Sequence, residues 1–260
     1  MHETAPSVFL IARPQVELAG MRAYLEDVGG QSWLERRLEE GEPNHGELLV
    51  EFGGRACYRS WEPGLNANVT RVRSDRREYL ENILRSAHGS VLEHANYTFA
   101  LRNVSRVFTH ELVRHRAGSA FSQESLRYVR LTDIGFRVPA ALAPVRERAL
   151  AIVEALEEFQ RDAAAALHID DEGVPFHVKK EVTSALRRLA PLGLSTDIIW
   201  SANLRTLRHV IEMRTDEGAE EELRSVFDEV ARVMVLEAPN VFQDFERDSA
   251  GCWRPRYRKV

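Results

Sequence analysis

The sequence predicts a single α/β domain over residues 1–260, and three observations indicate this class. Two short stretches, Ser7 to Ala12 and Ala95 to Leu101, have the length and the apolar or alternating pattern of strands. Longer stretches rich in Ala and Glu, such as Pro144 to Leu167, have the pattern of helices. No repeat, low-complexity tract or long linker separates these elements, so one domain is the simplest interpretation.

Composition and charge narrow the class of protein. An apolar fraction of 44% is enough to form a core, and a net charge of −5 argues against a dedicated nucleic-acid binder. Cys57 and Cys252 have neither metal-site nor disulfide spacing, so we expect reduced thiols, no metal and a cytoplasmic protein. No stretch approaches the ~18 apolar residues of a membrane span, so we expect no membrane partner.

The first elements follow from apolar spacing and from the positions of proline and glycine. Ser7 to Ala12 is predicted to be a buried strand. Pro14 is expected to open a helix that ends near Gly29. A second, charged helix over Gln31 to Glu40 is expected to stop at Gly41.

The next stretch contains one ambiguous element. Leu48 to Tyr58 fits a helix or a strand, because the pair Gly53-Gly54 weakens both interpretations. Ser74 is expected to cap a helix that runs to His88. Ala95 to Leu101 alternates as a half-buried strand does.

The rest of the chain is predicted to be mainly helical, with bounds set by prolines, glycines and apolar periodicity. In chain order the predicted elements are a helix over Val104–Val113, an extended segment over Gly118–Val129, helices over Pro144–Leu167 and Pro175–Leu189, a short strand over Ile198–Ala202, helices over Asn203–Arg214 and Glu217–Leu236, and a polar tail after Pro239.

The stretch from Arg114 to Arg130 concentrates basic charge in a chain that is acidic overall. Arginine suits phosphate, because its planar fork donates two parallel charge-assisted hydrogen bonds. A local basic cluster on an acidic chain indicates a site for a small anion rather than a nucleic-acid surface. The alternative is a solvated polar face.

The same stretch resembles the signature of the flavin-dependent thymidylate synthases. Its two halves are Arg114-His115-Arg116 and Ser122-Gln123-Glu124-Ser125-Leu126-Arg127-Tyr128. Eight residues, Ala117 to Glu124, separate the triplet from Ser125, one more than is usual in that family. The extra residue most simply falls between Ala117 and Phe121, where it affects the local path of the loop.

A second block, His88 to His94, has a high density of polar side chains between a helix and a strand. On the residues alone it fits a metal site or a capping box formed by Ser90 and Glu93. It is also similar to the family pattern His-x-[Ser/Thr]-x-x-Glu-His. By that resemblance, His88, Ser90 and Glu93 are implied to contact the flavin.

A third block, Asn203 to Arg214, fits an amphipathic helix and resembles the family pattern Asn-x-Arg-x-x-x-[Asn/His]-x-x-x-x-Arg. The resemblance implies that this block holds the flavin and, through Arg214, reaches the pyrimidine or its phosphate. The full set of cofactor contacts that it implies is His88, Ser90, Glu93, Arg114, His115, Arg116, Asn203, Arg205 and His209.

The nucleotide contacts come from the same resemblance. Arg187, four residues before Pro191, matches a nucleotide-binding arginine of the family, although on its own it also fits a surface arginine. Ser125 fits a nucleophile on bare chemistry, but no base stands at a suitable spacing, so a substrate-binding role is preferred. The implied nucleotide set is Arg114, Gln123, Ser125, Leu126, Arg127, Arg187 and Arg214, of which Arg114, Ser125 and Arg214 are expected to serve catalysis.

The sequence His110-Glu111-Leu112-Val113-Arg114-His115 invites comparison with a zinc-protease helix. The two histidines are five residues apart, which turns them ~140° from each other at ~100° per residue. They therefore cannot share one metal on one helix face. Glu111 stands where the family often has glutamine, and its role stays open.

The resemblance also implies a fold and a reaction. We expect a homotetramer with active sites at subunit interfaces, and an α/β domain with a mixed or antiparallel sheet flanked by long helices. The expected enzyme is a methyltransferase that converts dUMP to dTMP by reductive methylation at C5, with 5,10-methylenetetrahydrofolate, NADPH and FAD. Its expected partners are a nucleotide, a folate and other copies of the chain.

Two alternatives stay open from the sequence. One is a related FAD- and folate-dependent C5-methylase or hydroxymethylase of another pyrimidine nucleotide, such as UMP. The other is a non-catalytic nucleotide-binding protein that has kept the fold.

Overall fold

The computed structural model describes all residues from 1 to 260, which form two compact units. Each unit is built from separate stretches of chain. Unit 1 consists of Met1–Phe9, Ala100–Arg116 and Phe121–Trp200, and unit 2 consists of Leu10–Phe99, Ala117–Ala120 and Ser201–Val260. None of the helices combines the length and the apolar character that a membrane-spanning segment needs.

A four-stranded sheet has the order β2-β3-β6-β4, and each of its strands has residues in both units. Two further pairs complete the strands: β1 with β5, which is parallel, and β7 with β8, which is antiparallel. The predicted α/β class with antiparallel strand pairing is thereby confirmed. The strands are β1 His2–Glu3, β2 Ser7–Ala12, β3 Asn96–Ser105, β4 Ser119–Gln123, β5 Gly135–Phe136, β6 Ser195–Asn203, β7 Phe245–Arg247 and β8 Trp253–Pro255.

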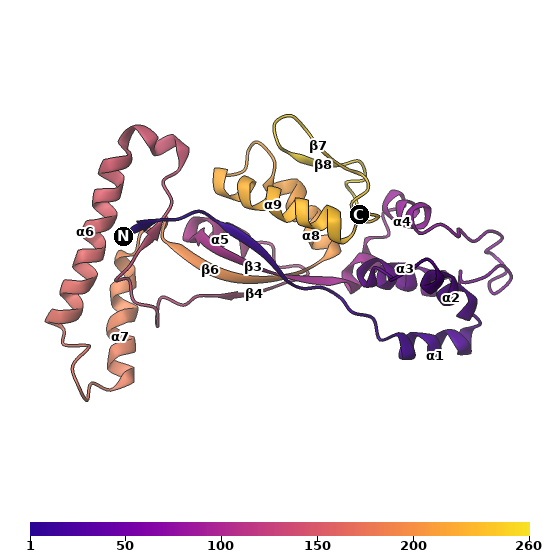
Figure 1. The fold of residues 1–260 in the computed structure, drawn as a ribbon, viewed down its shortest axis with the longest axis horizontal. Coiled ribbons are helices and arrows are strands. Elements are labelled where there is room, and N and C mark those ends of the chain that lie inside the picture. Colours follow the sequence, from indigo (N-terminus) through magenta and orange to yellow (C-terminus); the bar gives the residue numbers. More distant parts are fainter. The chain divides into compact units, whose positions relative to one another are not determined.

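Unit 1 contains two long helices that lie side by side, α6 and α7 (Figure 1). The Gln160 amide on α6 donates to the carbonyl oxygen of Leu186 at 3.1 Å and so links the pair. The apolar core of unit 1 consists of Leu131, Ile134, Phe136, Val153 and Leu194. The helices of this unit are α5 Arg106–Leu112, α6 Arg146–Ala166 and α7 Phe176–Leu186, with 3₁₀ turns η2 Ala140–Val145 and η3 Arg187–Leu189.

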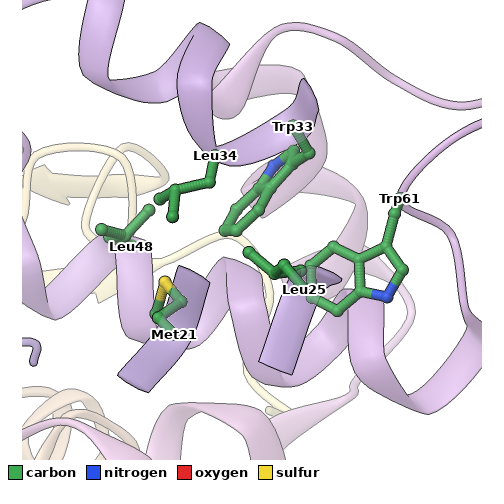
Figure 2. Close-up of a cluster of buried hydrophobic side chains, with 6 residues drawn as sticks. All are labelled: Met21, Leu25, Trp33, Leu34, Leu48 and Trp61. Carbon is green, nitrogen blue, oxygen red and sulfur yellow. The ribbon is translucent and has the colours of Figure 1, made fainter. Parts of the chain in front are cut away.

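Unit 2 has its own core between its first three helices, shown in Figure 2. The ring centroids of Trp33 and Trp61 are 5.0 Å apart, and both side chains are fully buried. Gly30 makes this contact possible, because a Cβ there would lie 2.8 Å from Trp61 and 2.7 Å from Leu25. The helices are α1 Leu18–Val28, α2 Gln31–Glu39, α3 His45–Tyr58, α4 Arg76–Arg85, the 3₁₀ turn η1 Gly89–His94, α8 Leu204–Arg214 and α9 Glu221–Glu237.

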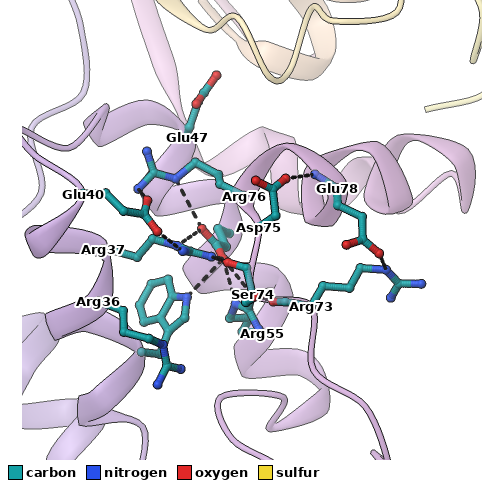
Figure 3. A network of polar contacts seen from close by, with 12 residues as sticks. Arg36, Arg37, Glu40, Glu47, Arg55, Arg73, Ser74, Asp75, Arg76 and Glu78 are labelled. Atoms are coloured by element: carbon teal, nitrogen blue, oxygen red, sulfur yellow. Dashed lines mark hydrogen bonds and ion pairs between the residues drawn. The ribbon is translucent and has the colours of Figure 1, made fainter.

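Beside this core lies a buried carboxylate, Glu51 on α3. Its oxygens accept from Arg37 at 2.7 and 2.9 Å, from Arg55 at 2.9 Å and from the Trp33 indole at 3.1 Å. Figure 3 shows the converging arginines, including Arg76, whose Nε is 3.5 Å from Glu51. A buried charge is stable only when it is paired and hydrogen-bonded, and Glu51 meets both conditions.

Several predicted elements are confirmed with adjusted bounds. The ambiguous stretch Leu48 to Tyr58 belongs to helix α3. Gly54 within it allows close helix packing, because a Cβ there would lie 2.6 Å from the hydroxyl of Tyr79. The helix expected from Pro14 begins at Leu18 instead, with Glu17 as its cap.

Two other predictions were wrong in detail. The strand Ser7–Ala12 is not buried: β2 is an edge strand, and Phe9 and Ile11 on one of its faces are 49% and 61% exposed. Asp75 rather than Ser74 caps α4, because its carboxylate accepts from Glu78 N at 2.7 Å.

The segment after Pro239, predicted to be a polar tail, forms the hairpin β7–β8. Asp248 in its turn accepts from the backbone N–H groups of Ala250 and Cys252, at 3.0 and 2.9 Å. Side-chain turns of this kind hold short hairpins that apolar periodicity does not reveal.

Candidate active site

The Arg-His-Arg triplet follows helix α5 in unit 1. Ser105 begins this helix by accepting a hydrogen bond from Phe108 N at 3.0 Å, as N-cap serines do. The helix ends at Leu112, and Arg114 N donates to the carbonyl oxygen of Glu111 at 3.3 Å. This turn leaves the side chains of Arg114 and Arg116 exposed.

The second half of the motif leaves strand β4 and enters a turn. Gln123 donates from its amide Nε2 to Thr109 on α5 at 2.9 Å, which fixes the orientation of the amide. The carbonyl oxygen of Ser125 accepts from the N–H groups of Tyr128 and Val129, both at 3.0 Å. The segment predicted as extended from Gly118 to Val129 is therefore a strand followed by a turn.

Between α5, this turn and α7 lies a pocket of about 1150 Å³ within unit 1. Five of its lining side chains are permanently cationic, whereas two are carboxylates, so it has an excess of positive charge. Such a pocket suits an anionic ligand of nucleotide size. The lining groups with charge or with hydrogen-bonding side chains are Arg106, Thr109, His110, Gln123, Glu124, Ser125, Arg127, His177, Lys180, Glu181, Ser184, Arg187 and Arg188.

Arg106 is the most constrained cation of this pocket. It donates to the carbonyl oxygen of Glu124 at 2.8 Å, but its Nε–H is buried without a hydrogen-bond partner. Burial lowers the pKa of Arg106; the Glu124 carboxylate opposes this effect, and the charge of Arg187 adds to it. A buried donor without a partner is costly, and an anion in the pocket would relieve that cost.

The structure brings five of the seven predicted nucleotide residues together. Gln123, Ser125, Leu126, Arg127 and Arg187 all line this one pocket. Leu126 also packs against the unit 1 core.

The other two predicted nucleotide residues are not among the lining residues. Arg114 lies in unit 1, outside the pocket, and Arg214 is the last residue of α8, in unit 2.

A second polar cluster lies in unit 2, where the turn η1 packs against helix α8. Glu93 of η1 and Arg205 of α8 form an ion pair at 2.5 Å, and each side chain is 47% exposed. His88 stacks on Tyr58 with ring centroids 5.7 Å apart. The hydrogen bonds of η1 include none from a capping side chain, so the capping-box interpretation of Ser90 was wrong.

Three more of the predicted flavin residues lie at helix α8 or at its N-terminal cap. Asn203 caps it by accepting from Thr206 N at 2.9 Å, and only 6% of Asn203 is exposed. Arg205 and His209 lie one turn apart on the exposed side of the helix. The predicted cofactor residues Arg114, His115 and Arg116 belong to unit 1.

The sequence model of the family described as "Thymidylate synthase complementing protein" matches residues 41–240. The chain is 38% identical to the flavin-dependent thymidylate synthase of Mycobacterium marinum over 206 residues, covering 77% of this chain and 80% of that protein. The enzymes of Mycolicibacterium gilvum and Corynebacterium glutamicum are 38% and 37% identical over the same shares of each chain. This chain belongs to the flavin-dependent thymidylate synthase family.

The unit 2 cluster has chemistry that fits the flavin cofactor of this family. FAD offers ribityl hydroxyls and a diphosphate, which need hydroxyl, imidazole and cationic partners. Ser90 is exposed, Arg205 is half exposed, and His88 is partly exposed beside an aromatic ring. Gly89 between them admits close backbone approach, because a Cβ there would lie 2.7 Å from Arg205 Nε.

The family motifs did not reveal three cations of the pocket: Arg106, Lys180 and Arg188. One signal was available for Arg106, since an arginine in the first turn of a helix is unfavourable against the helix dipole and suggests a binding role. Lys180 and Arg188 stand on α7 and η3 among other charged residues, where nothing in the sequence separates them from a solvated face.

Proposed function

We propose that this chain catalyses the reductive methylation of dUMP at C5 to dTMP, with 5,10-methylenetetrahydrofolate as carbon donor, NADPH as reductant and FAD as cofactor. Family membership supports the reaction. The observation that carries the proposal is the unit 1 pocket, where Gln123, Ser125, Arg127 and Arg187 meet in an anion-attracting cavity.

In this proposal the pocket binds the nucleotide and its cations hold the phosphate. Arg127 and Arg187 offer planar forks, and Arg106 offers its unpaired Nε–H. Thr109 keeps the Gln123 amide in one orientation, and Ser125 supplies a hydroxyl. We assign Ser125 to substrate binding, because its hydroxyl accepts from Arg127 N at 3.4 Å and does not donate to a histidine or a carboxylate that could take its proton.

The flavin is proposed to contact the unit 2 cluster. Bound FAD supplies the reducing hydride, so that tetrahydrofolate leaves without being oxidised. The residues proposed to hold it here are His88, Ser90, Glu93, Asn203, Arg205 and His209. We further propose that Arg114 and Arg214 act at the reacting end of the nucleotide, and that His115 and Arg116 contact the cofactor.

The active enzyme is proposed to be a homotetramer that builds each active site from more than one chain. Exposed apolar side chains on the long helices of unit 1 support an interface there: Ile152 and Phe159 on α6 are 57% and 44% exposed, and Phe176 on α7 is 68% exposed. Large exposed apolar groups on one element are typical of protein–protein contacts. We also propose that residues 1–260 form one domain. A cytoplasmic location is proposed as well, and the two free cysteines support it.

Purified protein with FAD, NADPH and methylenetetrahydrofolate tests the function directly. We expect conversion of dUMP to dTMP, tetrahydrofolate as co-product, and little turnover of UMP. Faster turnover of UMP than of dUMP would instead identify a methylase of another pyrimidine nucleotide. Absence of turnover with both nucleotides, in protein that binds FAD, would contradict the proposed reaction.

A further inference from the structure

Residues 241–260 lie outside the part of the chain that the family model matches, yet they reach the proposed flavin cluster. We propose that the segment Trp253–Val260 positions Arg205 for FAD binding. This inference rests on the proposed function, and it assigns a role to a segment that the family motifs do not include.

The segment follows helix α8 from its last turn to its first, in the opposite direction. At the helix C-terminus, Trp253 N donates to the hydroxyl of Thr215 at 2.9 Å. Also in the last turn of α8, the carboxylate of Glu212 is 3.1 Å from Arg258 Nε of the segment. At the helix N-terminus, the carbonyl oxygen of Val260 accepts from Arg205 Nε at 3.1 Å.

A buried ion pair anchors the middle of this segment. Arg208 of α8 is 4% exposed and makes a bidentate contact with Asp244 at 2.8 and 3.0 Å. The same carboxylate accepts from Tyr257 N at 3.0 Å, and Arg208 donates to the carbonyl oxygen of Tyr257 at 3.3 Å. Tyr257 also donates from its hydroxyl to Glu81 at 3.2 Å. The segment is therefore fixed on α8 through both backbone and side chains.

Arg205 needs such support because of its place in the helix. It stands in the first turn of α8, where the helix dipole disfavours a cation. Glu93 binds its Nη1 at 2.5 Å, and Val260 binds its Nε at 3.1 Å. These two contacts hold the guanidinium plane from two sides, and Nη2 takes part in neither.

The C-terminal segment also lies close to the turn η1. A Cβ at Gly89 would lie 2.4 Å from the backbone carbon of Val260. Residues 253–260 thus pack against both elements that are proposed to hold the flavin, η1 and α8. A pre-oriented arginine loses less freedom on binding a phosphate than a mobile one does, so the segment should strengthen FAD binding.

Three altered proteins test this without relying on activity. In a chain that ends at Arg256, we expect the FAD dissociation constant, measured by quenching of flavin fluorescence, to rise roughly tenfold. The Arg258→Glu variant, which keeps the full length, should weaken FAD binding in the same direction. Combining it with Glu212→Arg restores an ion pair across the same two positions, and we expect FAD affinity to recover. Binding of dUMP by calorimetry should be unchanged in all of these proteins.

The outcomes separate this inference from the proposed function. Unchanged FAD affinity in the shortened chain and in Arg258→Glu overturns the positioning role but leaves the function intact. Tighter FAD binding after shortening also overturns it, because the segment would then compete with the cofactor. If melting temperatures fall but FAD affinity holds below the melting range, the segment is only structural. A full-length protein that binds no FAD contradicts the cofactor assignment itself and this inference with it.

Discussion

The backbone N–H of Asn203 donates to the carbonyl oxygen of Gly118 at 3.1 Å. Next to this bond, the hydroxyl of Thr206 donates to the carbonyl oxygen of Ala117 at 2.7 Å. The loop that separates the two halves of the motif is thereby fastened to the first turn of α8. The small residues Ala117 and Gly118 of this loop allow its backbone to lie close to α8.

Gly118→Ala should destabilise this junction. Gly118 has φ +65°, and an added Cβ would lie 2.2 Å from Asn203 Nδ2 and 2.4 Å from Thr206 Oγ1. A left-handed non-glycine residue costs about 1–2 kcal/mol before any clash is counted. The conformational cost alone should lower the melting temperature by about 2–8 °C in calorimetry, and the clash should lower it further.

The matched control is Gly64→Ala, because Gly64 has φ +89° and open space around it. It should show the conformational cost alone. If both variants melt at the same temperature, the contact of Gly118 with α8 contributes nothing, and the loop is free to move.

Arg127→Lys should weaken nucleotide binding while FAD binding stays unchanged. Arginine presents two parallel donors to a phosphate, whereas lysine presents one point charge on a flexible stem. Losing one charge-assisted hydrogen bond corresponds to about 1.5–3 kcal/mol, or roughly a tenfold to hundredfold weaker affinity. Calorimetric titration of dUMP measures this. Arg148→Lys, on the exposed side of α6, serves as the control. Equal dUMP affinities in wild type and Arg127→Lys would mean that Arg127 is a solvated residue.

Replacing His88 and His209 together by alanine should weaken FAD binding. His88 stacks on Tyr58, and its Nε2 lies 3.3 Å from the Tyr58 hydroxyl, so its loss also leaves that ring unsupported. Flavin fluorescence quenching gives the affinity, and the exposed His168→Ala variant controls for loss of an imidazole elsewhere. An affinity equal to wild type would remove these residues from the cofactor site.

Glu51→Gln should reveal a pH-dependent contribution to stability. Burial raises the pKa of Glu51, but the hydrogen bond from Arg37 and the charges of Arg55 and Arg37 outweigh burial, so its pKa lies below the usual value. For a lowered carboxyl pKa, the stabilisation is fully present above the unfolded pKa of about 4.3 and is lost as pH falls through the folded value. Removing the charge leaves buried arginines unpaired, which costs about 3–5 kcal/mol near neutral pH.

Urea unfolding of wild type and Glu51→Gln between pH 7 and pH 3.5 measures the difference. We expect it to be constant above about pH 5 and to shrink below about pH 4.3. The exposed Glu39→Gln variant should match wild type throughout. A difference that grew as the pH fell would mean that the arginines do not hold the carboxylate charged.

The quaternary state should be larger than one chain of 29.6 kDa. Light scattering should give a mass four times that value, and Ile152→Glu on α6 should lower it, because a charge would then enter the proposed apolar contact. Arg148→Glu on the same helix is the control. A monomeric wild type with full activity would refute the shared active sites.

The sequence motifs predicted the parts of the site that are local in the chain. Gln123, Ser125 and Arg127 stand within five residues, and the resemblance of this stretch to the family signature implied that all three contact the nucleotide. Arg106 escaped this reasoning, because its role depends on burial beside Glu124, a tertiary contact that spacing does not encode. Helix caps shifted for the same reason. The carbonyl oxygen of Ser74 accepts from Arg37 of a distant helix, and capping falls to Asp75.

The fold was predicted where periodicity was strong. Long helices such as α6 and α9 kept their bounds within a few residues. Two element predictions were wrong: the burial of the edge strand β2, and the polar tail that is in fact the hairpin β7–β8. Exposure of β2 depends on its position at the sheet edge, and the hairpin β7–β8 depends on turn contacts of Asp248, neither of which apolar spacing records.

The parallel pairing of β1 with β5 constrains when this protein can fold relative to its synthesis. His2 pairs with Gly135, and Glu3 pairs with Phe136, so β1 must wait for a partner strand that is synthesised much later. At about 5–20 residues per second, that delay is on the order of ten seconds. Both units are also assembled from interrupted stretches of chain, so neither can condense from one continuous nascent segment. Folding of this enzyme should therefore be largely post-translational and slow, because contacts of such long range close large loops before they gain any stabilisation.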